Sequence, residues 1–453
     1  MVEGHTGTGA SKETGIDRGY TLNQAETFQP APRRSPKAEP STLLDRFARR
    51  LLLGRLEAIG GALLTISDGD NRHRLGDQSS ALVANITVND PRFYSTVAFG
   101  GAVAAAEAYM QNYWDCDDLT RVVRILVRNR PVLENMESNA RFLLAPIRKL
   151  LHFLNRNTRS GSKRNIAAHY DLSNDFFRLW LDETMMYSSA VFSREGMALE
   201  EAAAEKLDRI CRKLQLTADD HVLEIGTGWG GFAEFAASKY GCRVTTTTIS
   251  DEQFEFAKAR VHRAGLQDRV TLLRKDYRDL DGRYDKIVSI EMIEAVGHEY
   301  LRRFFDVCSS HLKDDGMMVL QAITIPDQRY ASALKSVDFI QRYIFPGGFL
   351  PSVTAMLEAA TAVTDLRLYH LEDIGEHYAH TLACWRSRFF DQAGKIRSMG
   401  FSEEFIRMWN YYFCYCEGAF TERAIGNVQM LFVKPGNRRT PITPDLGPAI
   451  TRS

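Results

Sequence analysis

The sequence lacks paired cysteines. Its seven cysteines include no C-x-x-C motif, and only Cys414 and Cys416 lie close together along the chain. This pattern argues against a disulfide framework and against a zinc site, and it favours a reducing cytosol. We therefore predict no metal site.

Long apolar runs and an excess of one charge are also missing. No uninterrupted apolar stretch approaches the ~18–20 residues that a membrane-spanning helix needs. The first residues, MVEGHTGTGASKETGIDRGY, lack the apolar centre of a signal peptide. Lys+Arg and Asp+Glu both number 57, so the net charge indicates no class of partner. We expect a cytoplasmic protein that contacts a membrane only peripherally.

Composition divides the 453 residues into five segments. Residues 1–40 are rich in Gly, Thr, Pro and charge, which predicts a disordered tail. Residues 41–150 combine helical spacing in STLLDRFARRLLLGRL with strand-like pieces such as ALLTISD and SALVANITV, which predicts a small α+β accessory domain. Residues 151–164 are interpreted as a basic linker, 165–435 as the main domain and 436–453 as a C-terminal tail.

A cationic, leucine-rich stretch precedes the main domain. The segment RFLLAPIRKLLHFLNRNTRSGSKRN carries seven Lys and Arg residues, and no acidic residue occurs between Glu137 and Asp171. Its pattern suits an interdomain helix with a solvated basic face as well as a surface that binds anionic phospholipid. Near such a membrane each basic residue contributes roughly 1 kcal/mol of binding energy. Leucine rather than stacking aromatic residues fills the apolar positions, so we predict a phospholipid bilayer surface as partner and no nucleic acid.

The main domain alternates strands with helices, which predicts a doubly wound, mostly parallel sheet of the α/β class. The predicted strands are HVLEIG, CRVTTTTIS, RVTLLRKD, YDKIVSIEMI, MMVLQAITI and NVQMLFVKP. The predicted helices between them are FAEFAASKY, DEQFEFAKARVHRAG and LRRFFDVCSSHLKDDG.

The first predicted strand runs into a glycine-rich turn. Gly226, Gly228 and Gly231 fit G-x-G-x-x-G, which by itself is a weak signal for a dinucleotide site. Such a site needs an acidic residue closing the second strand, but that strand closes with TTIS, and Asp251 lies beyond it as a cap of the next helix. Glu224, two residues before the turn, would repel a pyrophosphate and suits a cation. S-adenosylmethionine carries a sulfonium and an ammonium group and no phosphate, so it is the predicted cofactor.

Further residues at the carboxyl ends of the strands complete the predicted cofactor site. Asp276 follows the third strand, where its carboxylate could accept from the adenine amino group. Thr248 and Gln253 lie where the ribose is expected. The predicted cofactor-binding residues are Tyr187, Ser188, Glu224, Gly226, Gly228, Gly230, Thr248, Gln253, Asp276, Tyr277 and Ile290.

Several motifs occur in a fixed order over 165–435, about 270 residues. They include NIAAHYDLSNDFFRLWLDETMMYSSAVF, VLEIGTGWGGFAEFA, IVSIEMIEAVGHEYLRRFF, IFPGGFLPS and CEGAFTERAIGNVQMLFVKP. In these motifs the chain resembles cyclopropane-fatty-acyl-phospholipid synthases and mycolic acid cyclopropane synthases. The resemblance implies a Rossmann-like class I methyltransferase domain, and a homodimer by analogy only. It also implies transfer of a methyl(ene) group from S-adenosylmethionine to a cis double bond of a phospholipid acyl chain, giving a cyclopropane or methyl-branched chain.

In the family a bound bicarbonate accepts the proton that is lost during ring closure. Of the residues that hold it, Glu294 and Tyr378 match, and Ile323 lies where its backbone could contribute. The usual Cys is Ser189 here and the usual His is Gln321, whose side chain donates hydrogen bonds but carries no charge. Two alternatives stay open: an anion site that holds bicarbonate less tightly, or proton transfer directly to water and Glu294.

Two other functions compete with this hypothesis. A methyltransferase of the same fold could act, without ring closure, on a modified lipid or on a small soluble amine or alcohol, as some alkaloid N-methyltransferases do. The accessory domain and the basic segment argue against a soluble substrate. A lipid- or cofactor-binding protein without catalysis is the third possibility, and the presence of both Glu294 and Tyr378 argues against it.

Overall fold

The computed structural model describes residues 41–131 and 172–442. The predicted tail at 1–40, the basic segment at 141–164 and the final residues from 443 lie outside these described ranges. Among the residues that are described, no helix has the length and apolarity that crossing a membrane requires.

The N-terminal part is an α+β unit with a four-stranded sheet in the order β2-β1-β3-β4. Strands β1 and β3 pair in parallel, whereas β2 and β4 each pair antiparallel to their neighbour. Two strands, β2 and β4, were not predicted. The elements are α1 (Leu43–Leu56), β1 (Leu63–Asp68), β2 (Asn71–Gly76), β3 (Val83–Val88), α2 (Arg92–Met110), β4 (Trp114–Cys116) and α3 (Leu119–Arg128).

The main part contains a seven-stranded sheet in the order β10-β11-β9-β8-β5-β6-β7. The strands from β9 to β7 run parallel, and β11 and β10 close the sheet with antiparallel pairings. The predicted doubly wound, mostly parallel sheet is confirmed. The strands are β5 (His221–Ile225), β6 (Arg243–Thr247), β7 (Val270–Leu273), β8 (Tyr284–Ile290), β9 (Leu312–Thr324), β10 (Arg367–Asp373) and β11 (Gly426–Val433).

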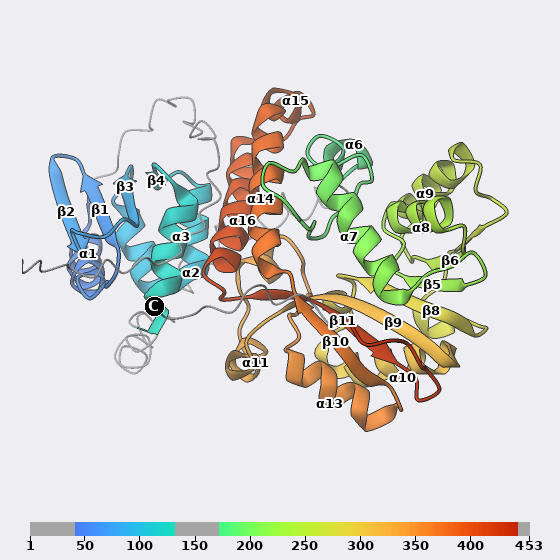
Figure 1. Cartoon of the computed structure of the whole chain (residues 1–453). Coiled ribbons are helices and arrows are strands. Elements are labelled where there is room, and N and C mark those ends of the chain that lie inside the picture. The colour runs from blue at the N-terminus through green and yellow to red at the C-terminus, as the bar shows by residue number, and fades with distance from the viewer. Residues whose placement is uncertain (1–40, 132–171, 443–453) are drawn as a thin grey trace, which may run out of the picture.

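Helices cover both faces of this sheet (Figure 1). Because side chains alternate along a strand, Leu223 of β5 packs into one apolar cluster while Val222 packs into the other. The first cluster contains Phe304 of α10, and the second contains Phe232 of α8. The covering helices are α7 (Leu199–Leu214), α8 (Gly231–Tyr240), α9 (Asp251–Arg263), α10 (Leu301–His311) and α13 (Val353–Val363).

One element boundary and one strand differ from the prediction. The helix predicted over LRRFFDVCSSHLKDDG ends at His311, because the chain turns extended at Leu312 and pairs there with Tyr284 of β8. Strand β10 was not predicted, and its register shifts between Leu368 and His370, which blurs the regular alternation of a strand.

Two long helices lie between the N-terminal unit and the seven-stranded sheet (Figure 1). They are α14 (Gly375–Asp391) and α16 (Glu403–Thr421), and α16 packs against both α2 and α3. Arg407 of α16 is buried, and its guanidinium donates to the backbone oxygens of Tyr109 and Trp114 at 2.6 and 3.0 Å. At the other end of this helix Glu422 pairs with Arg124 and Arg128 of α3.

Short helices complete the described chain. They are α6 (Asn174–Phe177), α11 (Asp327–Ala333), α12 (Phe339–Tyr343) and α15 (Ala393–Ser398), with single 3-10 turns at Tyr277–Asp279, Ile293–Ala295 and His298–Tyr300.

Candidate functional site

The glycine turn after β5 has the conformation of a ligand cradle. Gly226, Gly228 and Gly230 have φ of 100°, 51° and 82°, the left-handed region that glycine enters without steric cost. A Cβ on Gly226 would lie 3.1 Å from the side chain of Met292. The backbone amide of Gly226 donates to the backbone oxygen of Thr247 in β6 at 3.2 Å, so the turn is held against the neighbouring strand.

Glu224 brings a buried carboxyl to this turn. Its side chain lies on β5 and is only 3% exposed, and its Oε2 atom has no hydrogen-bond partner within residues 41–131 and 172–442. Burial raises the pKa of Glu224 to about 8. A buried carboxyl oxygen without a hydrogen-bond partner costs free energy unless a ligand compensates it. The open glycine turn and this carboxyl therefore fit a cationic ligand such as S-adenosylmethionine.

The other predicted cofactor residues lie at the carboxyl ends of neighbouring strands. Thr248 follows β6, and its hydroxyl donates to Gln253 of α9 at 2.9 Å. Ile290 is the last residue of β8. Asp276 follows β7 and forms two hydrogen bonds with the Arg278 guanidinium at 2.8 and 2.6 Å, and these bonds lower its pKa. Tyr277 packs edge-on against Phe304. An adenine amino group bound as predicted would therefore share the Asp276 carboxylate with the Arg278 guanidinium.

One helix cap differs from the prediction. Ser250, and not Asp251, caps α9, because the Ser250 hydroxyl accepts from the backbone amide of Gln253. Asp251 is the first residue of the helix. Its acidic side chain remains favourable there, next to the positive end of the helix dipole.

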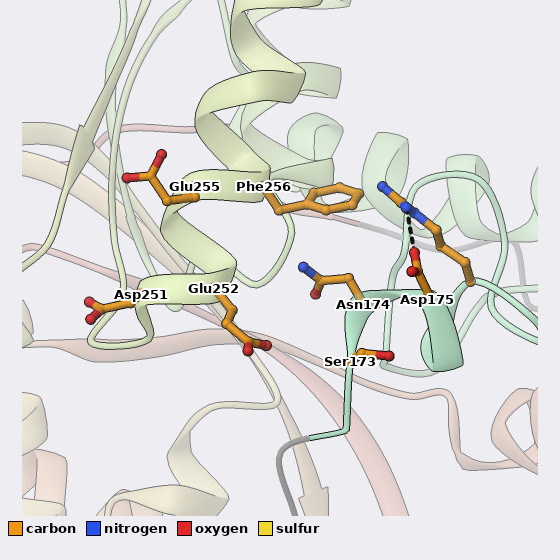
Figure 2. Close-up of a pocket in the computed structure, with 8 residues that line it drawn as sticks. Ser173, Asn174, Asp175, Asp251, Glu252, Glu255 and Phe256 are labelled. Atoms are coloured by element: carbon orange, nitrogen blue, oxygen red, sulfur yellow. Dashed lines mark hydrogen bonds and ion pairs between the residues drawn. The ribbon is translucent and has the colours of Figure 1, made fainter. Parts of the chain in front are cut away.

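A pocket of about 530 Å³ opens between α6 and the start of α9 (Figure 2). Four of its lining residues are carboxylates, and Asp175 forms an ion pair with Arg178 at 2.8 Å. None of the predicted site residues lines it. Its lining is Ser173, Asn174, Asp175, Arg178, Asp251, Glu252, Glu255 and Phe256.

The predicted catalytic residues converge on a carboxylate that the sequence analysis missed, that of Glu291. Its Oε1 accepts from the Ser189 backbone amide at 3.1 Å, from Gln321 Nε2 at 2.8 Å and from Asn427 Nδ2 at 2.5 Å. Its Oε2 accepts from the Tyr378 hydroxyl at 2.8 Å. Thus three of the residues predicted to hold an anion do surround a negative charge, and that charge belongs to the chain itself.

Glu294 and Ile323 form a separate contact in the same site. The Ile323 backbone amide donates to Glu294 Oε1 at 2.6 Å, and Glu294 Oε2 is buried without a partner in the described part of the chain. Burial, and then the neighbouring charge of Glu291, raise the pKa of Glu294 to about 8. Glu294 is therefore largely protonated at neutral pH.

Lys206, a buried lysine that was not predicted from the sequence, contacts a predicted cofactor residue and lies near this centre. Lys206 of α7 is fully buried, and its Nζ donates to the Ser188 hydroxyl at 2.8 Å. Burial lowers the pKa of Lys206 to about 8, and the charges of Glu291 and Glu224 oppose that shift. Lys206 therefore lies within the electrostatic reach of both carboxyl groups.

Aromatic side chains enclose the centre. Tyr187 donates to the hydroxyl of Tyr412 at 3.0 Å, and its ring lies 5.3 Å from that of Trp385. The ring of Tyr378 stacks on Phe420 with centroids 4.5 Å apart. Burial, and then the charge of Glu291, raise the pKa of Tyr378 well above its usual value, so its hydroxyl stays protonated and donates. The result is a dry site with ring faces around a fixed negative charge.

The signals for the missed residues were weak. Glu291 follows directly after β8, three residues before Glu294, and its φ of 49° is one that glycine favours. Asn427 lies in β11, and nothing in the sequence distinguishes its side chain from that of any other polar residue in a strand. No group of three or more His, Cys, Asp or Glu side chains suited to a metal ion occurs in the ranges that the structure describes.

This fold and site define an S-adenosylmethionine-dependent methyltransferase of the Rossmann-like class, and comparison with known proteins agrees. The solved structure of the mycolic acid cyclopropane synthase CmaA1 with SAH and CTAB is 33% identical, with a TM-score of 0.53 over 60% of this chain and 98% of that chain. The cyclopropane synthase MmaA2 of Mycobacterium tuberculosis is 30% identical, with a TM-score of 0.54 over the same shares of the two chains.

The chain belongs to the mycolic acid cyclopropane synthetase family, whose model matches residues 157–430. It is 38% identical to the tuberculostearic acid methyltransferase UfaA1 of M. tuberculosis over 74% of this chain and 80% of the relative. It is 36% identical to the cyclopropane-fatty-acyl-phospholipid synthase of Escherichia coli K12 over 77% and 87%. The family and these relatives support methylation of unsaturated lipid acyl chains.

Proposed function

We propose that this protein transfers a methyl(ene) group from S-adenosylmethionine to the cis double bond of an unsaturated acyl chain in a membrane phospholipid. The product is a cyclopropane or a methyl-branched acyl chain. The observation that carries the proposal is the buried centre in which Ser189, Gln321 and Tyr378 surround a carboxylate beside Glu294.

The aromatic enclosure suits the reaction. Methylation of an alkene produces a carbocation, which water would trap, so the site has to be dry. Ring faces such as those of Tyr187, Trp385 and Tyr378 stabilise a nearby cation by about 0.5–2 kcal/mol each. Trp385 is fully buried, and its ring lies 5.3 Å from Tyr187 and 6.0 Å from Tyr378. These side chains hold the alkene in place and exclude water from it.

The residues around the glycine turn would hold the methyl donor. S-adenosylmethionine supplies the methyl group and leaves as S-adenosylhomocysteine. The Glu224 carboxylate offers a negative charge to its cationic groups, and the left-handed glycines leave room for close approach of the ligand to the backbone. Thr248 and Gln253 offer polar groups at the end of β6.

A phospholipid surface is the proposed partner, on the cytoplasmic face of the membrane. From the end of α11 to just beyond the end of α12, three large apolar side chains are exposed to solvent. Leu334, Val337 and Phe345 are 37%, 66% and 44% exposed. Exposed apolar side chains of this kind, close together along the chain, support insertion between lipid headgroups.

The test is incubation of the protein with S-adenosylmethionine and vesicles of a monounsaturated phospholipid, followed by mass spectrometry of the acyl chains. We expect a gain of one CH2 unit, and none with vesicles of a saturated phospholipid. Proton NMR of the product distinguishes ring protons from those of a methylene or methyl branch. A protein that binds S-adenosylmethionine and leaves all acyl chains unchanged would contradict the proposal.

A further inference from the structure

The hydrogen-bond donors around Glu291 form a complete anion-binding site. They come from four segments far apart in the chain: the loop before α7, β9, α14 and β11. Ser189, Gln321 and Asn427 are fully buried, and all four donors are uncharged. Such a set of converging dipoles in a dry site binds one negative charge, and here the carboxylate of Glu291 fills it.

The carboxylate still has room for a proton. A carboxylate offers about four lone-pair positions. The Glu291 carboxylate accepts three hydrogen bonds on Oε1 and one, from Tyr378, on Oε2. Each oxygen has two of these positions, and because three of the four donors share Oε1, Oε2 accepts only from Tyr378 and keeps one position free among the described residues. Glu294 is less suited to this role, since its raised pKa of about 8 leaves it mostly protonated at neutral pH.

The backbone at this position also points to a functional role. Glu291 has φ of 49°, a left-handed conformation that is strained for a residue with a side chain and that glycine adopts freely. Its backbone amide donates to the backbone oxygen of Gln321 at 2.8 Å, which holds the residue between β8 and β9. The fold therefore tolerates strain to place a carboxylate among these donors.

We propose that the Glu291 carboxylate replaces bicarbonate and is the base that takes the proton from the methylated acyl intermediate. This inference rests on the proposed function. The alkene electron pair bonds to the donor methyl carbon while the C–S electrons go to sulfur, which leaves a carbocation on the acyl chain. Glu291 then takes a proton from a C–H bond of the added methyl group. The C–H electrons form either the third bond of the ring or, after a hydride shift to the cationic carbon, an exocyclic double bond. One CH2 is gained and one proton is released, without an added oxidant or reductant.

Two substitutions at this position separate a base from a structural residue. Glu291→Gln keeps the size and shape of the side chain but not its basicity. Glu291→Gly removes the side chain, suits the backbone conformation and leaves the four donors free for an external anion. Glu299→Gln is the matched control, because Glu299 is an exposed carboxylate in the following 3-10 turn. Circular dichroism and binding of S-adenosylmethionine check that each variant is folded.

Activity is measured on unsaturated phospholipid vesicles in buffer depleted of carbon dioxide, with and without added bicarbonate. We expect the unsubstituted protein and Glu299→Gln to be insensitive to bicarbonate. Glu291→Gln should lose at least about 100-fold in rate under both conditions. Glu291→Gly should be equally slow without bicarbonate and recover at least about tenfold with it, which loss of a merely structural residue would not produce.

The inference is overturned if the unsubstituted protein slows on depletion of bicarbonate, or if Glu291→Gln stays within threefold of it. It is also overturned if bicarbonate does not rescue Glu291→Gly. Failure of the proposed function looks different: the unsubstituted protein then yields no acyl product at any bicarbonate concentration.

Discussion

The buried carboxyl of Glu224 should make the affinity for S-adenosylmethionine depend on pH. Without a ligand, burial raises the pKa of Glu224 to about 8, so the group is mostly protonated at neutral pH. A cationic ligand stabilises the ionised form, and binding below pH 8 is therefore accompanied by release of a proton. The affinity should rise with pH until the empty site is itself ionised.

The magnitude follows from this pKa. Each pH unit below it costs about 1.4 kcal/mol of binding free energy, a factor of ten in affinity. We expect the dissociation constant to fall by up to about 15-fold from pH ~6.5 to pH ~8, and by no more than about a further twofold above that. Lys206 titrates in the same range, because burial lowers its pKa to about 8. In the Glu224→Gln variant the pKa of Lys206 should fall further, because the charge of Glu224 no longer opposes the effect of burial, so the difference between the two profiles reports Glu224 together with its effect on Lys206.

The assay is isothermal titration calorimetry across this pH range in two buffers of different ionisation enthalpy, which counts the released protons. Glu224→Gln should bind more weakly at high pH and show a flatter profile. Glu234→Gln is the control, since Glu234 is a partly exposed carboxylate of α8. The reasoning is refuted if Glu224→Gln keeps the slope of the unsubstituted protein, or if affinity falls as pH rises.

Three further predictions concern stability and the cofactor turn. The pKa of Glu294 is raised from 4.5 to about 8, so the free energy of unfolding of the ligand-free protein should fall by up to about 1.4 kcal/mol for each unit that the pH rises between these values. Thermal unfolding of Glu294→Gln should therefore depend less steeply on pH than that of the unsubstituted protein. Gly231→Ala should weaken S-adenosylmethionine binding by about 1–3 kcal/mol in the same calorimetry, because the new Cβ would lie 2.9 Å from the Thr184 oxygen; unchanged affinity would contradict this contact. Arg407→Met should lower the free energy of unfolding in urea by about 3 kcal/mol, since it removes two buried charge-assisted hydrogen bonds to backbone carbonyls, whereas exposed Arg302→Met should change little.

The regular part of the fold could be read from local patterns. Strands β5 and β8 are short apolar runs, and the glycines at 226, 228 and 230 lie where a turn must take left-handed φ, so their positions follow from local rules. Strand β10 was not predicted because its apolar residues Leu368, Tyr369 and Leu371 do not alternate regularly with polar residues, and its register shifts between Leu368 and His370.

By itself, the sequence determined the α/β class, the glycine turn with Glu224 two residues before it, and the identities of Ser189, Gln321 and Tyr378. It could not show what these three residues bind, because their donors meet only when segments nearly 200 residues apart pack together. Tertiary structure alone decided that the anion among them is the carboxylate of Glu291, which Asn427 completes from the last strand. The physical reason is that a short motif sets a side chain's chemistry, whereas the charge it faces is set by the packing of distant elements.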